Sequence, residues 1–351
     1  MILDELAVPI VLAPLAGGPS TPQLAAAVSA AGGLGFLGAG YLTPMALADR
    51  LGQTRALTGA PFGVNLFMPG EPAAPGPVAA YAAALADEAR RAGVDLGTAR
   101  FDEDDWAPKI SLLISDPVPV VSFTFGSPDA GVISRLRDGG SEVWITVTTA
   151  AEARLASGAG ADVLVVQGAE AGGHRGSFRD DPDEDLTDGI GLLSLLQLVH
   201  AQVAAPLVAA GGISTGAGIA AVLAAGAGAA QLGTAFLRCP EAGTADVHRQ
   251  AVASPAPTAM TRAFTGRTAR GIRNRFLDEH SATAPAAYPD VHHLTAPLRQ
   301  AGRAAGDRDL VNLWAGQTHE LGRDLPAGEL VRTLVAEARA AARQAADRLG
   351  G

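Results

Sequence analysis

One unit recurs through the first two-thirds of this chain and constrains its fold more than any other feature. A short apolar run is followed by a turn marked by Gly or Pro, and then by an Ala- and Leu-rich segment with helical spacing. Runs that are apolar on both faces are typical of parallel strands covered by helices. We expect strands at eight such runs: Ile10–Ala13, Leu34–Gly38, Phe62–Phe67, Val118–Phe123, Val143–Val147, Val163–Gln167, Leu207–Ala210 and Ala229–Leu232.

Start and stop signals predict helices between these runs. Ser or Thr, in two cases with Pro, precedes the helices expected over residues 23–31, 45–57, 150–157 and 217–225. Gly32-Gly33, Gly158 and Gly226 are expected to end three of them. Eight strand–helix units predict an α/β fold of the closed (β/α)8 TIM barrel type, which needs about 250 residues. A doubly wound open sheet is the alternative, but no GxGxxG turn follows the first run.

The predicted barrel divides the chain into three parts. Residues 1–253 would form the barrel, residues 254–326 a polar connecting region on the substrate side, and residues 327–351 a C-terminal helix that packs back on the barrel. Neither of the last two parts has enough apolar strand or helix for an independent core. Loops over a barrel face carry binding residues, so Tyr288, His292 and His293 are candidates for substrate contacts.

The charge balance excludes several kinds of partner. The 26 basic and 36 acidic residues give a net charge of −10, which disfavours binding to nucleic acid and to anionic membrane surfaces. The segment Met1–Glu5 lacks the basic start of a signal peptide. Two uncharged stretches are long enough to cross a membrane, but Gly and Pro interrupt both. We therefore expect a cytoplasmic protein without a membrane partner.

Metal and thiol chemistry lack the necessary residues. Lys109 is the only lysine and Cys239 the only cysteine, so the sequence cannot form a P-loop lysine motif, a disulfide or a Cys-ligated metal centre. The acidic run Arg179–Asp185 lacks the Gly and the final Glu of a calcium loop, which favours a solvated loop. The histidines lack ligand spacing. We therefore expect no metal site.

The segment Val163–Gly176 combines an expected strand with a loop rich in glycine. In a barrel this loop lies on the catalytic face. Gly172 and Gly173 remove side-chain bulk, so that a flat ligand could approach the backbone beside His174. Histidine exchanges protons near neutral pH. We therefore predict that His174 is catalytic.

Glycines also follow the last two expected strands, where barrels commonly bind phosphate. Backbone N–H groups at Gly211, Gly212 and Gly233, with the hydroxyls of Ser214 and Thr234, could hold a phosphate without any lysine. Two amides, Asn65 and Gln167, interrupt otherwise apolar strands and need hydrogen-bond partners. A heterocycle with carbonyls and ring nitrogens would supply these partners, and neighbouring backbone is an equally good source.

Motifs along nearly the whole chain resemble the nitronate monooxygenase family, formerly called 2-nitropropane dioxygenases. The string from Gln167 to Gly176, with Gly-Gly-His-Arg-Gly at its end, is highly specific for this group and its near relatives. The other matching segments are Ala13-Pro14-Leu15-Ala16, Ser20–Leu24, Gly32–Gly35, Phe62–Asn65, Ala210–Ile213, Gln231–Thr234, Phe264–Gly271 and Trp314–Gln317.

The resemblance implies an FMN-dependent barrel enzyme in which His174 removes the acidic proton of a nitroalkane. The oxidised flavin would then take an electron from the nitronate, and O2 would complete the conversion to a carbonyl compound and nitrite. The small-molecule substrates would be nitronates, nitroalkanes and O2. The residues implied or predicted to bind FMN are Ala13, Pro14, Leu15, Asn65, Gln167, Gly172, Gly173, Gly211, Gly212, Gln231, Leu232, Gly233 and Thr234.

The chain departs from the family pattern in two places. The family's Ala-Pro-Met is Ala-Pro-Leu15 here, a change that conserves volume. The expected end of strand four, Ser122–Gly126, has no cation for the negative charge of a reduced flavin, which leaves a helix N-terminus or an arginine from elsewhere. An FMN-dependent NAD(P)H reductase of the enoyl-acyl-carrier-protein or quinone type is the alternative function, and a non-catalytic FMN-binding protein is a third. A homo-oligomer is left open.

Overall fold

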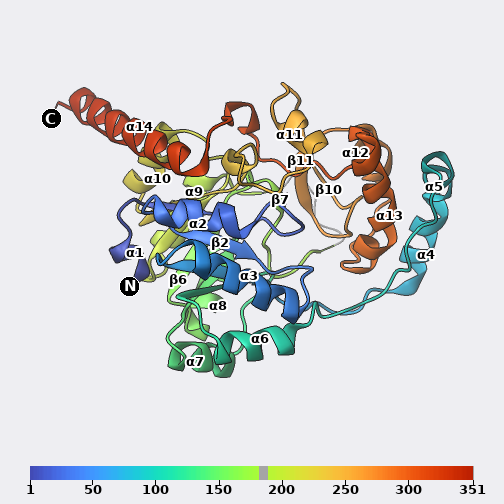
Figure 1. Cartoon of the computed structure of the whole chain (residues 1–351), viewed down its shortest axis with the longest axis horizontal. Helices are drawn as coiled ribbons and strands as arrows, with labels where there is room; N and C mark the ends of the chain where they lie inside the picture. The colour runs from blue at the N-terminus through green and yellow to red at the C-terminus, as the bar shows by residue number, and fades with distance from the viewer. Residues whose placement is uncertain (182–188, 351) are drawn as a thin grey trace.

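A computed structural model describes residues 1–181 and 189–350 and shows a barrel of parallel strands (Figure 1). The eight-stranded sheet has the order β1-β9-β8-β6-β5-β4-β3-β2. The Leu12 N–H donates to the Leu34 carbonyl and the Leu34 N–H donates to the Ile10 carbonyl, which joins β1 to the residue before β2 and closes the barrel. The TIM barrel prediction is confirmed. The strands are β1 (Ile10–Leu12), β2 (Gly35–Gly38), β3 (Phe62–Phe67), β4 (Val120–Thr124), β5 (Glu142–Val147), β6 (Val163–Gln167), β8 (Leu207–Ala210) and β9 (Ala229–Leu232).

Helices between the strands cover the outside of the barrel, and threonine caps start four of them. Thr21, Thr43, Thr149 and Thr215 each accept a hydrogen bond from a backbone N–H in the first helical turn, as expected. The covering helices are α2 (Pro22–Ala30), α3 (Pro44–Leu57), α6 (Trp106–Ser115), α7 (Ala130–Asp138), α8 (Ala150–Ala159), α9 (Leu192–His200) and α10 (Gly216–Ala224).

One predicted helix end is wrong. Helix α8 continues through Gly158 and ends at Gly160, which adopts a left-handed backbone with φ of 104°. Glycine takes this conformation without a steric penalty, so Gly160 ends the helix instead of Gly158. Gly32 and Gly226 follow α2 and α10 with positive φ values, as a helix stop requires.

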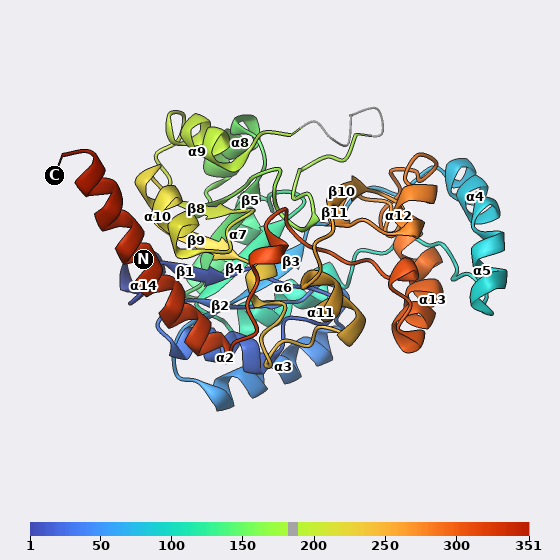
Figure 2. The same ribbon diagram turned by 90° about the horizontal axis from the view of Figure 1, so that it is seen from above.

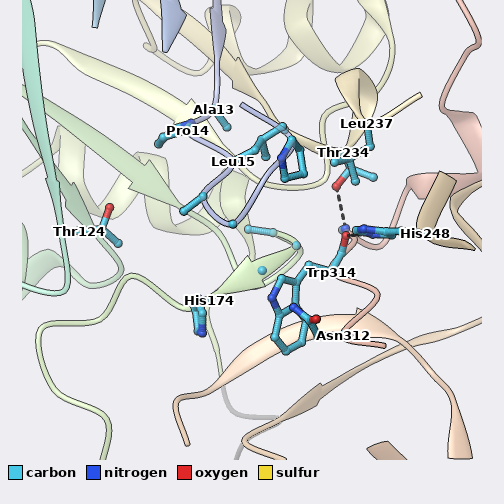
Figure 3. Close-up of a pocket in the computed structure, with 18 of the residues that line it drawn as sticks. Ala13, Pro14, Leu15, Thr124, His174, Thr234, Leu237, His248, Asn312 and Trp314 are labelled. Atoms are coloured by element: carbon cyan, nitrogen blue, oxygen red, sulfur yellow. Dashed lines mark hydrogen bonds between the residues drawn. The ribbon is translucent and has the colours of Figure 1, made fainter. Parts of the chain in front are cut away.

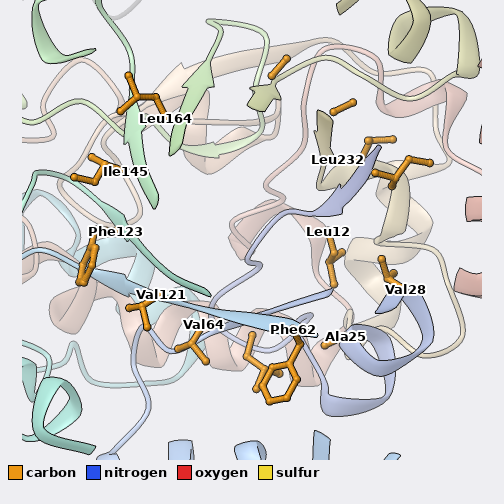
Figure 4. Packing of buried hydrophobic residues seen from close by; sticks show 14 of the residues in the cluster. Leu12, Ala25, Val28, Phe62, Val64, Val121, Phe123, Ile145, Leu164 and Leu232 are labelled. Atoms are coloured by element: carbon orange, nitrogen blue, oxygen red, sulfur yellow. The ribbon is translucent and has the colours of Figure 1, made fainter. Parts of the chain in front are cut away.

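The main core lies between the strands and the covering helices. Leu12, Val64, Phe123 and Ile145 belong to this layer and are fully buried (Figure 4). Alternate residues of the same strands, such as Val11 and Trp144, form a separate cluster. This alternation follows from the two-residue repeat of a strand, and it uses both faces of the apolar runs.

A second hydrophobic cluster lies outside the barrel. After β3 the chain leaves the barrel to form α4 (Pro75–Ala84) and α5 (Ala86–Ala92), which lie beside α12 (Arg275–His280) and α13 (Asp290–Ala305) (Figures 1 and 2). Residues from both segments, Tyr81 and Phe264 among them, share this cluster. The polar region 254–326 was expected to have no core of its own. It shares a core with α4 and α5, which lie within the residues that were predicted to form the barrel.

The remaining elements connect the barrel to its C-terminal helix. Strand β10 (Thr258–Thr261) pairs with β11 (Ala269–Ile272), which pairs with the two-residue strand β7 (Gly173–His174). Short helices are α1 (Ile2–Glu5), η1 (Thr234–Phe236), α11 (Asp246–Val252), η2 (Arg308–Leu310) and η3 (His319–Leu321).

The first half of α14 (Ala327–Arg348) packs against α10 and α2, and its second half projects outward (Figure 2). Among the helices within the described residues, none combines the length and the apolar character needed to span a membrane.

Candidate active site

A cavity of about 550 Å³ opens at the carboxyl ends of the strands (Figure 3). Its lining includes these residues selected from the sequence: Ala13, Pro14, Leu15, Asn65, Gln167, Gly172, Gly173, His174, Gly211, Gly212, Gln231, Gly233 and Thr234. Leu232 does not line the cavity. Its side chain is 1% exposed and lies in the core between strands and helices, because neighbouring residues of a strand face opposite sides.

The loops after β8 and β9 form a backbone cradle on one side of this cavity. Gly211 and Gly212 have φ values of 121° and 64°, and a Cβ on Gly212 would lie 2.9 Å from the Cβ of Glu170. Within residues 1–181 and 189–350, the N–H groups of Gly212 and Gly233 donate to no protein acceptor. Free N–H groups in such a turn bind anions. The geometry therefore suits a phosphate.

The segment after η2 ties these two loops together. The Thr318 hydroxyl donates to the Gly212 carbonyl at 2.9 Å, and its oxygen lies 2.9 Å from the Ser214 hydroxyl. The Gly316 N–H donates to the Thr234 hydroxyl at 2.9 Å. Residues far apart in the sequence thus fix the cradle, and Thr318 was not predicted from the sequence.

The two amides predicted from the strands, Asn65 and Gln167, make different hydrogen bonds. Gln167 Nε2 donates to the His174 carbonyl at 3.1 Å, and its Oε1 accepts the Gly176 N–H at 2.8 Å. Both ends of this amide therefore hold the loop after β6 that carries His174, which we call the histidine loop. Asn65 Nδ2 donates to the hydroxyls of Ser122 and Thr124, whereas its Oδ1 has no hydrogen bond within the described parts of the chain. Asn65 keeps an acceptor for a ligand.

Glycine at position 172 is required by the protein itself. A Cβ there would lie 2.4 Å from the Ala315 carbonyl carbon and the Gly316 nitrogen, so the main chain already fills that space. Gly173 is different because its φ is 75° and a Cβ would meet nothing within 4 Å. Close packing thus explains Gly172, and the left-handed turn before His174 explains Gly173.

The imidazole of His174 projects from β7 into a ring of aromatic side chains. The ring centroids of Phe125, Tyr288 and Trp314 each lie 5.7 Å from that of His174. The Nε2 atom lies 2.9 Å from the Thr265 hydroxyl. Burial, reinforced by the positive charge of Arg267, lowers the pKa of His174 to about 3. The imidazole is therefore neutral at pH 7 and carries a free lone pair.

Arginines supply the positive charge that the end of strand four lacks. The Arg267 guanidinium lies 3.8 Å from the centre of the Phe125 ring. Arg299 lies on α13, is 5% exposed and lines the cavity. Burial lowers its pKa to about 10, so it stays charged at pH 7. Arg299 donates to the Thr295 hydroxyl and the His292 carbonyl, and no carboxylate within the described residues pairs with it.

The three candidates for the substrate side have different positions. His292 lines the cavity and stacks on Tyr41, with ring centroids 4.1 Å apart. The Tyr288 hydroxyl donates to the Tyr41 hydroxyl at 3.2 Å, next to the His174 ring. His293 instead bonds to Asp102 at 2.6 Å and is not part of the lining. Only His292 of this histidine pair reaches the cavity.

The acidic run Arg179–Asp185 was expected to be a solvated loop, and the structure differs from this expectation at Asp180. This carboxylate is 11% exposed and accepts bonds from Arg262 at 3.0 Å and from the Thr268 hydroxyl at 2.6 Å. It therefore links the histidine loop to β10 and β11. Residues 182–185 of the run lie outside the described residues.

A sequence profile, related proteins and solved structures each match almost the whole chain. The sequence profile described as nitronate monooxygenase matches residues 2–337. A nitronate monooxygenase from Pseudomonas aeruginosa is 41% identical, over 94% of this chain and 96% of that protein. A crystal structure of nitroalkane oxidase from Streptomyces ansochromogenes is 55% identical, with a TM-score of 0.95, and covers 98% of this chain and 99% of that chain. The structure of FabK from Thermotoga maritima is 26% identical, with a TM-score of 0.77, and covers 99% of this chain and 97% of that chain.

Proposed function

The chain belongs to the nitronate monooxygenase family and is a flavin-dependent oxidoreductase, and from that premise we propose its substrates and cofactor. It uses FMN and O2 to oxidise alkyl nitronates, and neutral nitroalkanes after proton removal, to carbonyl compounds and nitrite. One observation carries this proposal: the neutral imidazole of His174 and the charged Arg299 line the same cavity as the glycine cradle.

The cavity has the donors and acceptors that FMN requires. The N–H groups of Gly212 and Gly233 would hold the phosphate, and Asn65 Oδ1 would accept a hydrogen bond from the ring. The backbone around Leu15 would flank the ring. Bound FMN would accept electrons from the nitronate and deliver them to O2. In this proposal residues 1–253 bind FMN, residues 254–326 cover the substrate and residues 327–351 support the barrel.

Charge in the cavity favours an anionic substrate. Burial is the main cause of the lowered pKa of His174, and the positive charges of Arg267 and Arg299 lower this pKa further. The same charges attract a nitronate, and a nitronate needs no proton removal. With a neutral nitroalkane, His174 takes the proton as a general base. The nitronate that forms beside the imidazolium then raises its pKa by Coulomb attraction.

The test is nitrite release in air by purified, FMN-loaded protein. We expect nitrite from small alkyl nitronates, and a larger loss on neutral nitroalkane than on preformed nitronate in the variant His174→Asn. Absence of nitrite with several nitronates would overturn the proposed function. Equal losses of activity on both substrates would remove the assignment of His174 as the base.

A reductase that takes hydride from NAD(P)H is the second candidate, because the structural similarity to FabK extends over nearly the whole chain. The lower identity, 26% against 55% for the nitroalkane oxidase, favours the first candidate. Anaerobic mixing with NADH separates the two, since rapid bleaching of the flavin would favour the reductase. Stoichiometric FMN without turnover in either assay would indicate a non-catalytic flavin-binding protein.

A further inference from the structure

Thr265 lies in a tightly held turn between β10 and β11, next to the cavity. Its side chain is 2% exposed. The N–H groups of Thr265 and Gly266 donate to the Arg262 carbonyl at 3.2 and 2.8 Å. Gly266 has a φ of 77°, and a Cβ there would lie 2.4 Å from the Ala287 carbonyl oxygen. The turn therefore has little freedom to shift, and it presents the Thr265 hydroxyl to His174 at a fixed position.

This turn is also anchored to the loop that carries His174. Asp180 lies six residues after His174, is largely buried, and accepts two hydrogen bonds from the Arg262 guanidinium at 3.1 and 3.0 Å. Strand β11, which follows the turn, pairs with β7 and sets Ala269 opposite His174. The histidine and the threonine are thus joined both through the sheet and through an ion pair, so their relative position is well defined.

Two contacts of the Thr265 hydroxyl bear on which imidazole nitrogen carries the proton. Its Oγ1 lies 2.9 Å from His174 Nε2 and 3.4 Å from the Arg267 carbonyl oxygen. The Arg267 carbonyl can only accept, so it offers the hydroxyl proton a direction away from His174, although this contact is the longer of the two. The hydroxyl lone pair then accepts Nε2–H, which leaves the His174 lone pair on Nδ1. Within residues 1–181 and 189–350, Nδ1 has no hydrogen-bond partner, and the imidazole lines the cavity.

We propose that Thr265 is a positioning residue that keeps the proton of neutral His174 on Nε2 and presents the Nδ1 lone pair as the proton acceptor. The proposal rests on the proposed function, because it makes Nδ1 the atom that removes the proton from a nitroalkane. When Nδ1 gains that proton, the Nε2–H bond to the hydroxyl becomes charge-assisted and stronger. Thr265 therefore stabilises the imidazolium more than the imidazole. A preformed nitronate loses no proton and gains nothing from this bond.

Three variants test the proposal. Thr265→Val keeps the side-chain shape and removes the hydroxyl, and Thr265→Ser restores the hydroxyl. Thr244→Val is the matched control, because Thr244 is 7% exposed and its hydroxyl has no hydrogen-bond partner within the described residues. Circular dichroism and urea unfolding of each variant establish that the fold is retained.

The first readout is the nitrogen NMR spectrum of the imidazole in purified full-length protein labelled with ¹⁵N-histidine. The signals of His174 are assigned by their absence in His174→Asn. We expect a protonated Nε2 and an unprotonated Nδ1 in the wild type, Thr265→Ser and Thr244→Val, and a mixture of tautomers in Thr265→Val. A proton on Nδ1 in the wild type, or an unchanged spectrum in Thr265→Val, would overturn the proposal. This reading holds whether or not the protein forms nitrite.

The second readout separates positioning from a purely structural role. A hydrogen bond to a charged group contributes enough that Thr265→Val should lower kcat/KM for a neutral nitroalkane by about 10- to 100-fold. The value for the preformed nitronate should stay within about twofold, and Thr265→Ser should recover most of the loss. Equal losses on both substrates would refute the proposal. Failure of the wild type on both substrates would refute the proposed function instead and leave the NMR result to decide the tautomer.

Discussion

Three neutral histidines at the cavity should make the fold sensitive to mild acid. Burial lowers the pKa of His174 to about 3, that of His248 to about 4 and that of His292 to about 2. In the unfolded chain the same side chains titrate near pH 6.5. Below pH 6.5 the unfolded state therefore binds protons that the folded state does not, and the free energy of unfolding falls as the pH falls. This loss continues down to each folded pKa.

The magnitude follows from these pKa values. Between pH 7.5 and pH 5, each of the three histidines should lower the free energy of unfolding by about 2 kcal/mol. Their sum, about 6 kcal/mol, is comparable with the whole stability of many domains. The carboxylate of Glu88 contributes little in this range. Glu88, whose pKa its arginine and histidine partners lower to about 2 against the cost of burial, loses its contribution only below about pH 4.5.

The assay is urea unfolding at pH 7.5 and pH 5.0, at one FMN concentration, for the wild type, His174→Gln and His248→Gln. The second variant is informative because His248 Nε2 donates to the Trp314 carbonyl at 2.9 Å, a bond that the Gln amide can replace. Each variant should lose about 2 kcal/mol less than the wild type on acidification. An acid loss equal to that of the wild type in either variant would show that the replaced ring is not held neutral.

Two further substitutions test the cradle and the link to the histidine loop. Gly212→Ala should weaken FMN binding measured by fluorescence titration, because its Cβ would lie 2.9 Å from Glu170 Cβ at a positive φ, whereas Gly228→Ala, with no atom closer than 3.7 Å, should bind FMN like the wild type. Equal affinities would contradict the cradle. Asp180→Asn should cost about 3–5 kcal/mol in urea unfolding by leaving the buried Arg262 without its partner, and the double variant with Arg262→Met should recover part of that loss. A cost below about 0.5 kcal/mol would mean that the pair is solvated.

The barrel was predictable because its signals are local. The ends of each predicted strand differ from those of the observed strand by at most two residues, and each predicted threonine cap starts a helix. The excursion through α4 and α5 was not predictable in the same way. Its buried residues, such as Tyr81 and Leu85, find their partners near Phe264 and Leu298, and no local pattern indicates which distant segment covers an apolar face.

The residues of the candidate site also fall into those that local sequence signals predict and those that distant segments bring to the cavity. Residues that follow directly from strand ends, such as His174 and Gly212, line the cavity as expected. Arg299 and Thr318 reach it only because the chain returns from outside the barrel. The motif from Phe264 to Gly271 held a usable signal for Thr265 and Arg267, since it combines a hydroxyl, a glycine and a guanidinium within four residues. For Arg299 the sequence offers only one of two arginines, with Arg303, on an amphipathic helix.

The visible absorption spectrum of the purified protein, recorded without oxygen before and after addition of an alkyl nitronate, tests most directly whether the cavity holds a reactive flavin beside His174. We expect a yellow protein whose flavin absorption changes on addition of the nitronate and returns when air is admitted. A colourless protein that fails to take up added FMN, or a bound flavin that the nitronate leaves unchanged, would contradict this assignment of the cavity.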